Sequence, residues 1–315
     1  MEEFNLGLEI IQFIKLTFLT IVPFLLAAQG TALAGRTGVY NVSQEGTMLA
    51  SASVGFIVAY QTGSLWLGGV GAALAGLLFG LVLAFMTTTL KMNQFIIGLT
   101  LFFVGVGIST LIPKLVIGVT LTPPLIPTLP NIPIPLLSKI PVIGPILFDQ
   151  NFLFYFSVAL SGLLYYFLYR TSWGLELRSV GENPRAADSL GINVSLMRYL
   201  AVIIGAMIIG IAGVYLPMVY TGTFTEQMTK GRGWLAGALC FFGGWRPHTI
   251  LFGSLFFAAI EVLAFWVQVR LKTIPYQFLV MLPYIGTLII MALTFKRSTV
   301  PGFLGGNYDR EKRIL

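Results

Sequence analysis

Long apolar stretches without a single charged residue dominate this 315-residue sequence. A helix that crosses a bilayer needs about 20 mostly apolar residues, because an unpaired peptide group in hydrocarbon costs several kcal/mol. The six uncharged stretches comprise residues 16–35, 46–90, 95–113, 151–169, 199–225 and 273–295. A seventh region, residues 233–269, is almost as apolar. The sequence therefore predicts an all-α polytopic membrane helix bundle.

Two of these regions are long enough to be divided. Residues 46–90 hold two spans, and the polar residues 60–64 are the natural turn between them. Residues 233–269 are interrupted at 243–247, where Gly243, Gly244 and Pro247 cannot continue a regular helix, so a short segment precedes a full span. We predict about nine transmembrane helices, within a range of eight to ten, in one transmembrane domain over residues 1–315.

Composition excludes several other classes of protein. Hydrophobic residues make up 56% and charged residues 10% of the chain, against roughly 25% charged residues in ordinary globular proteins. This excludes a disordered chain, a coiled coil and a nucleic-acid-binding domain. The net charge of +7 is dispersed between the apolar regions, which is typical of a membrane protein with cationic loops. With Cys240 and His248 as the single residues of their types, we expect neither a metal site nor a cofactor.

Positive charges predict the orientation in the cell membrane. The segment 170–198 carries four arginines, and the end of the chain carries Lys296, Arg297, Arg310, Lys312 and Arg313, so both are expected in the cytoplasm. Nine spans then place the N-terminus and the Pro-rich residues 113–150 outside. Lys230, Arg232, Arg270 and Lys272 would also lie outside, against the rule. The acidic N-terminal residues do not suit a signal peptide, and residues 16–35 are kept as the first span.

A polar cluster at residues 36–48 stands where the second apolar region begins. A carboxylate such as Glu45 at membrane depth costs about 2 to 3 kcal/mol or more, so it must face the bundle interior, pair or become protonated. A broken helix lining a cavity would allow this. Equally, Arg36 and Glu45 are candidates for interfacial caps at the membrane edge. Glu261 is a second carboxylate within a span, and we expect it to be a structural partner of a basic residue.

Residues 174–192 carry the sharpest local signal. Asn183 can cap a helix whose first residue is Pro184, and Gly191 can close that helix after two turns. A short helix with a cap at each end, between two spans, is rigid enough to transmit force. A helical turn without any mechanical role is the alternative.

Small residues are dense at 68–76 and 205–213. Helices without Cβ bulk approach closely and gain dispersion contacts that lipid tails do not supply. We therefore expect these residues to pack helices, with hinge points as the alternative.

At the polar cluster and the capped helix the chain closely resembles the permease subunits of ABC importers for simple sugars and nucleosides, the ribose/galactoside permease group. The family pattern N-x-x-x-E-G-x-M is matched by Asn41, Glu45, Gly46 and Met48. Its loop pattern is matched by Gly174, Arg178, Gly181, Asn183, Ala186, Ala187, Gly191 and Ile192. Residues 231–234, 242–247, 274–276 and 282–284 look like those of nucleoside-type members. Ser43 and Gln44 depart from the family pattern. This departure bears on which substrate is transported more than on the fold.

The resemblance implies a transporter half that is not itself an enzyme. Its partners would be a second, non-identical permease, cytoplasmic ATP-binding subunits and an extracellular substrate-binding lipoprotein. The sequence agrees, since it contains no G-x-x-x-x-G-K-[ST] phosphate loop. The ATPase would dock on a coupling helix at residues 183–191, with the contact residues Glu182, Asn183, Pro184, Arg185, Ala186, Ala187, Asp188 and Gly191. Along the substrate pathway we expect Asn41, Gln44, Glu45, Met48, Asn93 and Gln94.

Two other functions stay open on the sequence alone. An ion-coupled secondary carrier would share the helices and the carboxylates Glu45 and Glu261, but it would not need the capped helix. An intramembrane enzyme would need a nucleophile and a base, and His248 and Ser254, six residues apart, do not share one helical face.

Overall fold

The computed structural model describes residues 6–118, 122–141, 143–270, 275–294 and 299–310. Its long helices are α1 (Leu6–Gly35), α2 (Gln44–Thr62), α3 (Leu65–Ala84), α4 (Gln94–Val116), α6 (Phe152–Arg170), α9 (Val194–Tyr215), α11 (Pro247–Arg270) and α12 (Tyr276–Thr294). Shorter elements are η1 (Phe85–Thr89), β1 (Asn131–Pro133), η2 (Leu137–Lys139), α5 (Ile143–Leu147), β2 (Asp149–Asn151), α7 (Ser172–Glu182), α8 (Pro184–Ser189), η3 (Leu216–Thr221) and α10 (Arg232–Phe242). The predicted all-α bundle is confirmed.

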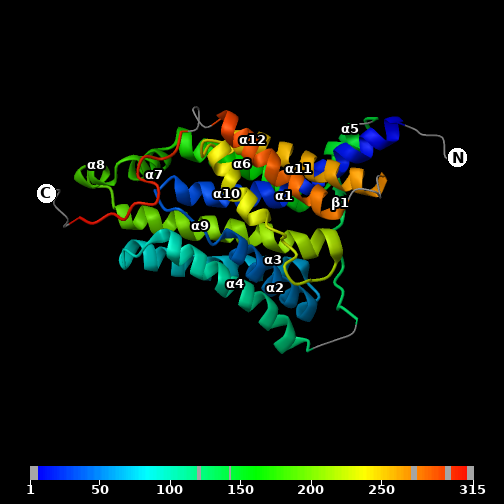
Figure 1. Cartoon of the computed structure of the whole chain (residues 1–315), viewed down its shortest axis with the longest axis horizontal. Coiled ribbons are helices and arrows are strands. Elements are labelled where there is room, and N and C mark those ends of the chain that lie inside the picture. Colours follow the sequence, from blue (N-terminus) through cyan, green and yellow to red (C-terminus); the bar gives the residue numbers. More distant parts are fainter. Residues whose placement is uncertain (1–5, 119–121, 142, 271–274, 295–298, 311–315) are drawn as a thin grey trace.

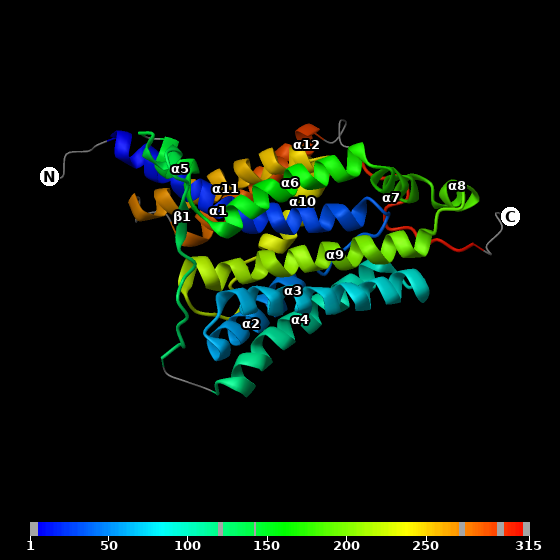
Figure 2. The same ribbon diagram turned by 180° about the vertical axis from the view of Figure 1, so that it is seen from behind.

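Most of the long helices run along the longest axis of the molecule (Figure 1). One end, which we call the α8 end, carries α7, α8 and the C-terminal segment. The other, the β1 end, carries α5, β1 and the N-terminus, and the view from behind shows the same division (Figure 2).

Six of the described helical segments are long and apolar enough to cross a membrane. They are Glu9–Gly35, Leu65–Thr89, Gln94–Val116, Phe152–Arg170, Val194–Thr221 and Pro247–Arg270. Three further helices do not meet this standard. Helix α2 is as long as α6 but is more polar, and α10 has only 11 residues. The apolar part of α12 is limited to Gln277–Ile289. Nine spans therefore stay a prediction. Residues 273, 274 and 295 of the last predicted span, and Lys296, Arg297, Lys312 and Arg313, lie outside the described residues.

Both predicted breaks are confirmed. Gly63 ends α2 in the left-handed conformation, with φ +68°, and the Ser64 hydroxyl caps α3 by accepting from the Leu67 N–H. Helix α10 ends before Gly243, and α11 begins at Pro247. One predicted boundary is wrong: α9 begins at Val194, because the Asn193 side chain caps it, and it includes Arg198. The charge of Arg198 suggested a loop, but its side chain is buried within the fold.

The predicted extended form is found in only part of the Pro-rich segment 113–150. Residues 122–134 contain no helix, whereas residues 113–116 belong to α4, and η2 and α5 lie within residues 137–147. The Ile126 and Leu129 N–H groups donate to the Gly222 and Met218 carbonyls at 2.8 Å. Strands β1 and β2 then pair antiparallel, with Ile132 opposite Gln150. Residues 119–121 and 142 of this segment are outside the described residues.

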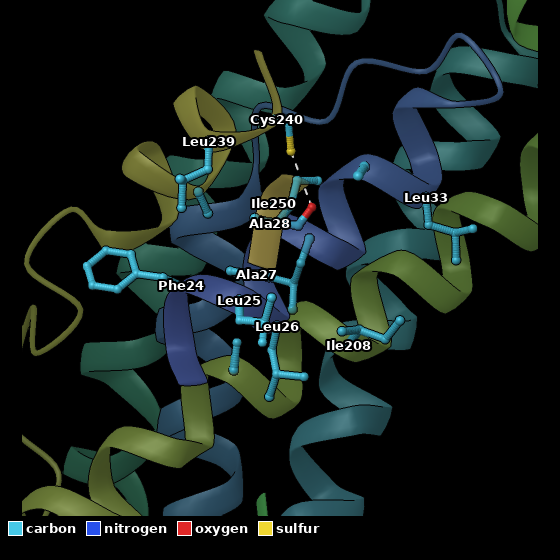
Figure 3. Packing of buried hydrophobic residues seen from close by; sticks show 14 of the residues in the cluster. Phe24, Leu25, Leu26, Ala27, Ala28, Leu33, Ile208, Leu239, Cys240 and Ile250 are labelled. Carbon is cyan, nitrogen blue, oxygen red and sulfur yellow. Dashed lines mark hydrogen bonds between the residues drawn. The ribbon is translucent and has the colours of Figure 1, made fainter. Parts of the chain in front are cut away.

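Helix α1 runs through the centre of the bundle and packs against α9, α10 and α11. Its residues Phe24, Leu25 and Leu26 are almost completely buried (Figure 3). The Cys240 thiol of α10 donates to the Ala28 carbonyl at 3.2 Å, which draws α10 onto α1. Other helices cover α1 on several sides. Because α10 packs on α1 among them, it is held inside the bundle rather than at its surface.

The small residues pack helices together, as predicted. A Cβ at Gly76 of α3 would collide with the Ala206 carbonyl of α9, and one at Gly213 would collide with the Met48 carbonyl of α2. A Cβ at Gly205 would collide with the Gly30 carbonyl of α1. Backbones therefore meet at these positions.

Two glycines of α3 give a matched test of this packing. We expect Gly76→Ala to lower the free energy of unfolding by about 1–3 kcal/mol, because the helices must separate. A methyl group at Gly69 would have no other atom of the described residues within 4 Å. Gly69→Ala should therefore be neutral or stabilise by up to about 1 kcal/mol through helix propensity. Thermal unfolding of both variants in detergent measures this difference. Equal shifts in the two midpoints would contradict the packing role.

Candidate functional site

Helix α10 is a short helix, and six of its residues are buried in the bundle. Its 11 residues span about 16 Å, or about half the hydrocarbon thickness of a bilayer. The first N–H groups and the last carbonyls of a helix lack partners within that helix. At membrane depth such groups need partners from elsewhere in the protein.

The Glu45 carboxylate supplies the partners at the N-terminus of α10. Its Oε1 atom accepts from the Thr229 hydroxyl at 2.6 Å and from the Gly231 N–H at 2.8 Å. Its Oε2 atom accepts from the Gly233 N–H at 2.6 Å. A negative charge at a helix N-terminus also interacts favourably with the helix dipole. Glu45 thus faces the bundle interior, as one of the two sequence interpretations required.

Two glycines explain why Glu45 can reach these groups. Gly231 precedes α10 with φ +81°, a conformation that L side chains rarely adopt. A Cβ at Gly233 would lie 2.5 Å from the Glu45 Cα atom. Gly231 is therefore required by its backbone conformation, and Gly233 by the close approach of Glu45.

Arg36 supplies the partners beyond the other end of α10. Its guanidinium donates to the Trp245 and Gly244 carbonyls at 2.8 and 3.0 Å and to the Tyr169 hydroxyl at 3.0 Å. Burial lowers the pKa of Arg36, and Tyr169 and Glu182 oppose this shift. Glu45 thus caps α10 from within the protein, whereas Arg36 binds carbonyls of the turn between α10 and α11, beyond the last residue of α10. Caps at the membrane edge, the other interpretation of the sequence, stay a prediction.

The other predicted pathway residues divide into two groups. Asn41, Gln44 and Met48 are buried next to Glu45. Within the described part of the chain, the Asn41 amide nitrogen and the Gln44 amide oxygen have no hydrogen-bond partner. They therefore offer one free donor and one free acceptor within the bundle.

Asn93 and Gln94 lie at the α8 end instead. The Asn93 side chain caps α4 by accepting from the Phe95 and Ile96 N–H groups, and it is exposed. Gln94 is buried, and its amide accepts from the Tyr40 N–H at 2.7 Å and donates to the Gly306 carbonyl at 3.1 Å. Both amides are thus engaged with backbone groups.

A cavity of about 250 Å³, lined by both polar and apolar residues, opens beside the N-terminus of α10. Its polar lining consists of Lys230, Arg232, Glu261, Gln268 and Tyr284, from the α10, α11 and α12 region. Arg232 forms an ion pair with Glu261, which confirms the predicted basic partner of Glu261. We call this space the α10–α12 cavity.

Helix α8 has the caps that the sequence predicted. The Asn183 side chain accepts from the Ala186 N–H at 3.1 Å, Pro184 is the first helical residue, and Gly191 follows with φ +85°. Pro184 and Ala187 face inward, where Ala187 packs in a small core with residues of α7 and α9.

The outer side of α8 is open. Arg185, Ala186 and Leu190 are exposed, and Leu190 is 80% exposed although it is apolar. Sequence reasoning missed Leu190, and it also missed α7, which precedes α8. The sequence feature that could have indicated Leu190 is an apolar residue between the capped helix and Gly191.

The C-terminal segment, residues 299–310, is tied to α7 and α8. The Phe303 N–H donates to the Gly181 carbonyl at 2.9 Å. The Asp188 carboxylate accepts from the Tyr308 hydroxyl at 2.9 Å and pairs with Arg310 at 3.1 Å. Desolvation, followed by the hydrogen bond to Asp188, raises the pKa of Tyr308, so its hydroxyl stays protonated as a donor.

The same segment is also tied to α4 and α9. The Gly306 carbonyl accepts from Gln94 and from the buried Arg198, the latter at 3.2 Å. Asp309 pairs with Lys91 at 2.7 Å. Residues 299–310 therefore join α8 to the start of α4, a connection that sequence patterns did not predict.

Comparisons with known proteins identify the family. A model of the permease component of branched-chain amino acid transport systems matches residues 13–294. The chain belongs to this permease family. It is 32% identical to the guanosine ABC transporter permease protein NupQ of Bacillus subtilis, over 97% of this chain and 100% of that protein. It is 39% identical to the nucleoside ABC transporter permease protein NupC of Lactococcus lactis, over 57% of each chain.

The fold also resembles that of a solved structure. A chain of PsaBC from Streptococcus pneumoniae, solved in complex with a Fab, aligns with a TM-score of 0.50 and 16% identity, covering 88% of this chain and 90% of that one. This likeness concerns the fold alone. Together, the family and the apolar helices identify this chain as a multi-pass membrane permease of the ABC transporter class.

Proposed function

We propose that this permease forms half of the translocation pathway of an ATP-driven importer for a nucleoside or a simple sugar. The observation that carries the proposal is the rigid, exposed α8, with a cap at each end. A separate ATPase needs a stiff element to push against, and an ion-coupled carrier does not. The nucleoside assignment rests on the names of the relatives from Bacillus subtilis and Lactococcus lactis.

In this proposal the α8 end faces the cytoplasm, together with the C-terminus. Arginines in residues 170–198 favour this side, and the Pro-rich residues 113–150 then lie outside. Cytoplasmic ATP-binding subunits would dock on α8, an extracellular lipoprotein would deliver the solute, and a second, non-identical permease would complete the pathway. Closure of the ATPase would move α8 together with its flanking spans, α6 and α9, as one body.

The pathway residues take different roles in this proposal. Asn41 and Gln44 are proposed to contact the solute, because each keeps an unpartnered buried polar atom. Glu45 and Met48 would shape the wall beside them. Asn93 and Gln94 would act by positioning α4 and the C-terminal segment, since their amides are engaged with backbone groups.

The test is uptake by proteoliposomes that contain the full chain with the ATPase, partner permease and lipoprotein encoded beside it. We expect ATP-dependent uptake from a panel of nucleosides and monosaccharides. Uptake that follows an ion gradient without any ATPase would favour a secondary carrier instead. In the same assay, unchanged uptake by Asn41→Ala and Gln44→Ala would remove these residues from the pathway.

Two exposed leucines test the proposed ATPase contact. We expect Leu190→Asp to abolish co-purification of the ATPase, because it replaces an apolar side chain that is 80% exposed beside α8 with a negative charge. Leu136→Asp provides a matched control, since Leu136 is 83% exposed but lies near β1, at the opposite end (Figure 1). Retention of the ATPase by Leu190→Asp, or its loss from both variants, would contradict docking on α8.

A further inference from the structure

The α10–α12 cavity holds an ion pair that the proposed coupling does not use. Arg232 is the first residue of α10, and Glu261 lies in the middle of α11, an apolar helix that is long enough to span a membrane. The two side chains are 12% and 29% exposed. Ionisable groups at this depth are costly, and they commonly mark pathways for solutes or ions.

A purely structural ion pair would be expected to satisfy all of its own polar atoms. Here the Arg232 Nε–H donor and the Glu261 Oε2 acceptor have no hydrogen-bond partner among the residues that the structure describes. The pair therefore keeps one free donor and one free acceptor on residues that line the same cavity. Leaving such groups unpaired costs about 1–3 kcal/mol each, and more when they are charged.

The chemistry of these two atoms selects a class of solute. An anion could accept from Arg232, but Glu261 would repel it. A cation could contact Glu261, but Arg232 would repel it. A zwitterion could contact both side chains, but it would bring two further charges out of water, at a cost of several kcal/mol for each. A hydroxyl group both donates and accepts, so two neighbouring hydroxyl groups on a neutral solute can satisfy the donor and the acceptor together.

The rest of the lining agrees with a neutral ring-bearing solute. Gln268 offers a further donor and acceptor, and Phe265, which is 58% exposed, offers an aromatic face. The Tyr284 hydroxyl donates to the Lys230 carbonyl at 3.1 Å, which holds the rim of the cavity. A volume of about 250 Å³ suits one small solute rather than a larger ligand.

We propose that the α10–α12 cavity binds a neutral solute through a pair of neighbouring hydroxyl groups, as in a ribose or a simple sugar. The inference deepens the proposed function and rests on it. The Arg232–Glu261 pair would open to admit the two hydroxyl groups. Arg232 and Glu261 would then lose part of their contact with each other, and each would gain a contact with the solute.

Cysteine labelling tests this proposal, because the single native cysteine, Cys240, is completely buried. Gln268→Cys places a reactive thiol in the cavity. Ala264→Cys does the same from α11 without removing a polar group, so it serves if Gln268→Cys fails to fold. Gln12→Cys is the matched control, because Gln12 is exposed on α1 and lines a different cavity. Each variant is labelled with N-ethylmaleimide in proteoliposomes of the assembled transporter.

We expect guanosine or ribose to slow labelling in the cavity, by about threefold at twice the dissociation constant, because only the unoccupied fraction reacts. The 2′,3′-dideoxy analogue of guanosine should not protect, and Gln12→Cys should react at one rate throughout. Equal protection by both solutes, or none by either, would overturn the inference. Labelling that is slow in bilayers, fast in detergent and insensitive to solute would assign the cavity to lipid and would also overturn it.

The same vesicles separate this inference from the proposed function. ATP-dependent uptake without protection of the cavity would leave the importer standing and remove the binding site. Absence of ATP-dependent uptake would remove the importer itself.

Discussion

Glu45→Ala should lower the free energy of unfolding by about 4 kcal/mol, which is large beside the total of about 5–15 kcal/mol for a typical domain. The substitution leaves the Thr229 hydroxyl and the Gly231 and Gly233 N–H groups without their acceptor. Each buried donor without a partner costs about 1–3 kcal/mol. The measurement is the midpoint of thermal unfolding in detergent, together with the amount of folded protein in the membrane.

Two further variants make the Glu45 prediction specific. Glu45→Gln keeps the shape but replaces one acceptor oxygen by a donor, so we expect an intermediate loss. Thr229→Ala removes a single donor and should cost about 1 kcal/mol. If Glu45→Ala unfolds at the wild-type temperature, then Glu45 does not cap α10. If Glu45→Ala lowers the stability but Glu45→Gln and Thr229→Ala do not, the shape of the Glu45 side chain rather than its hydrogen bonds explains the effect.

Arg36→Met should lower the free energy of unfolding by about 3 kcal/mol. The methionine keeps the apolar part of the side chain but leaves the Gly244 and Trp245 carbonyls unpaired, and hydrogen bonds to charged groups contribute about 1.5–3 kcal/mol each. Arg36→Lys should retain part of this stability, since an ammonium group lacks the planar fork that reaches both carbonyls. Thermal unfolding in detergent again gives the comparison.

Tyr169→Phe is the control for Arg36. It removes one hydroxyl that accepts from the Arg36 guanidinium and leaves both carbonyl contacts in place, so its effect should be about 1 kcal/mol. If Tyr169→Phe destabilised the protein as much as Arg36→Met, the carbonyl contacts beyond α10 would not explain the role of Arg36.

The features predicted correctly from the sequence depend on neighbouring residues. The turn at Gly63, the break before Pro247 and the cap at Asn183 each follow from a residue type and from hydrogen bonds within a few positions. The glycines within 68–76 and 205–213 also identified helix packing, because close helix contacts in membranes require small residues.

Residues whose partners are distant could not be placed in the same way. Arg198 was expected at a loop end, but it is buried, with bonds to Thr37 and Gly306. The connection of residues 299–310 to α8 and α4 likewise joins segments more than 100 residues apart, such as Tyr308 with Asp188.

The sequence by itself determined that this chain is an apolar helix bundle with a capped α8, because helix length, helix ends and membrane insertion are local properties. Only the tertiary structure decided that Glu45 holds the N-terminus of α10 and that Arg36 holds the turn between α10 and α11. These partners around α10 lie 184 to 209 residues away in the chain. A buried charge is stable only where the folded backbone presents enough hydrogen-bonding groups to it. That arrangement forms only when helices that are distant in the sequence pack together.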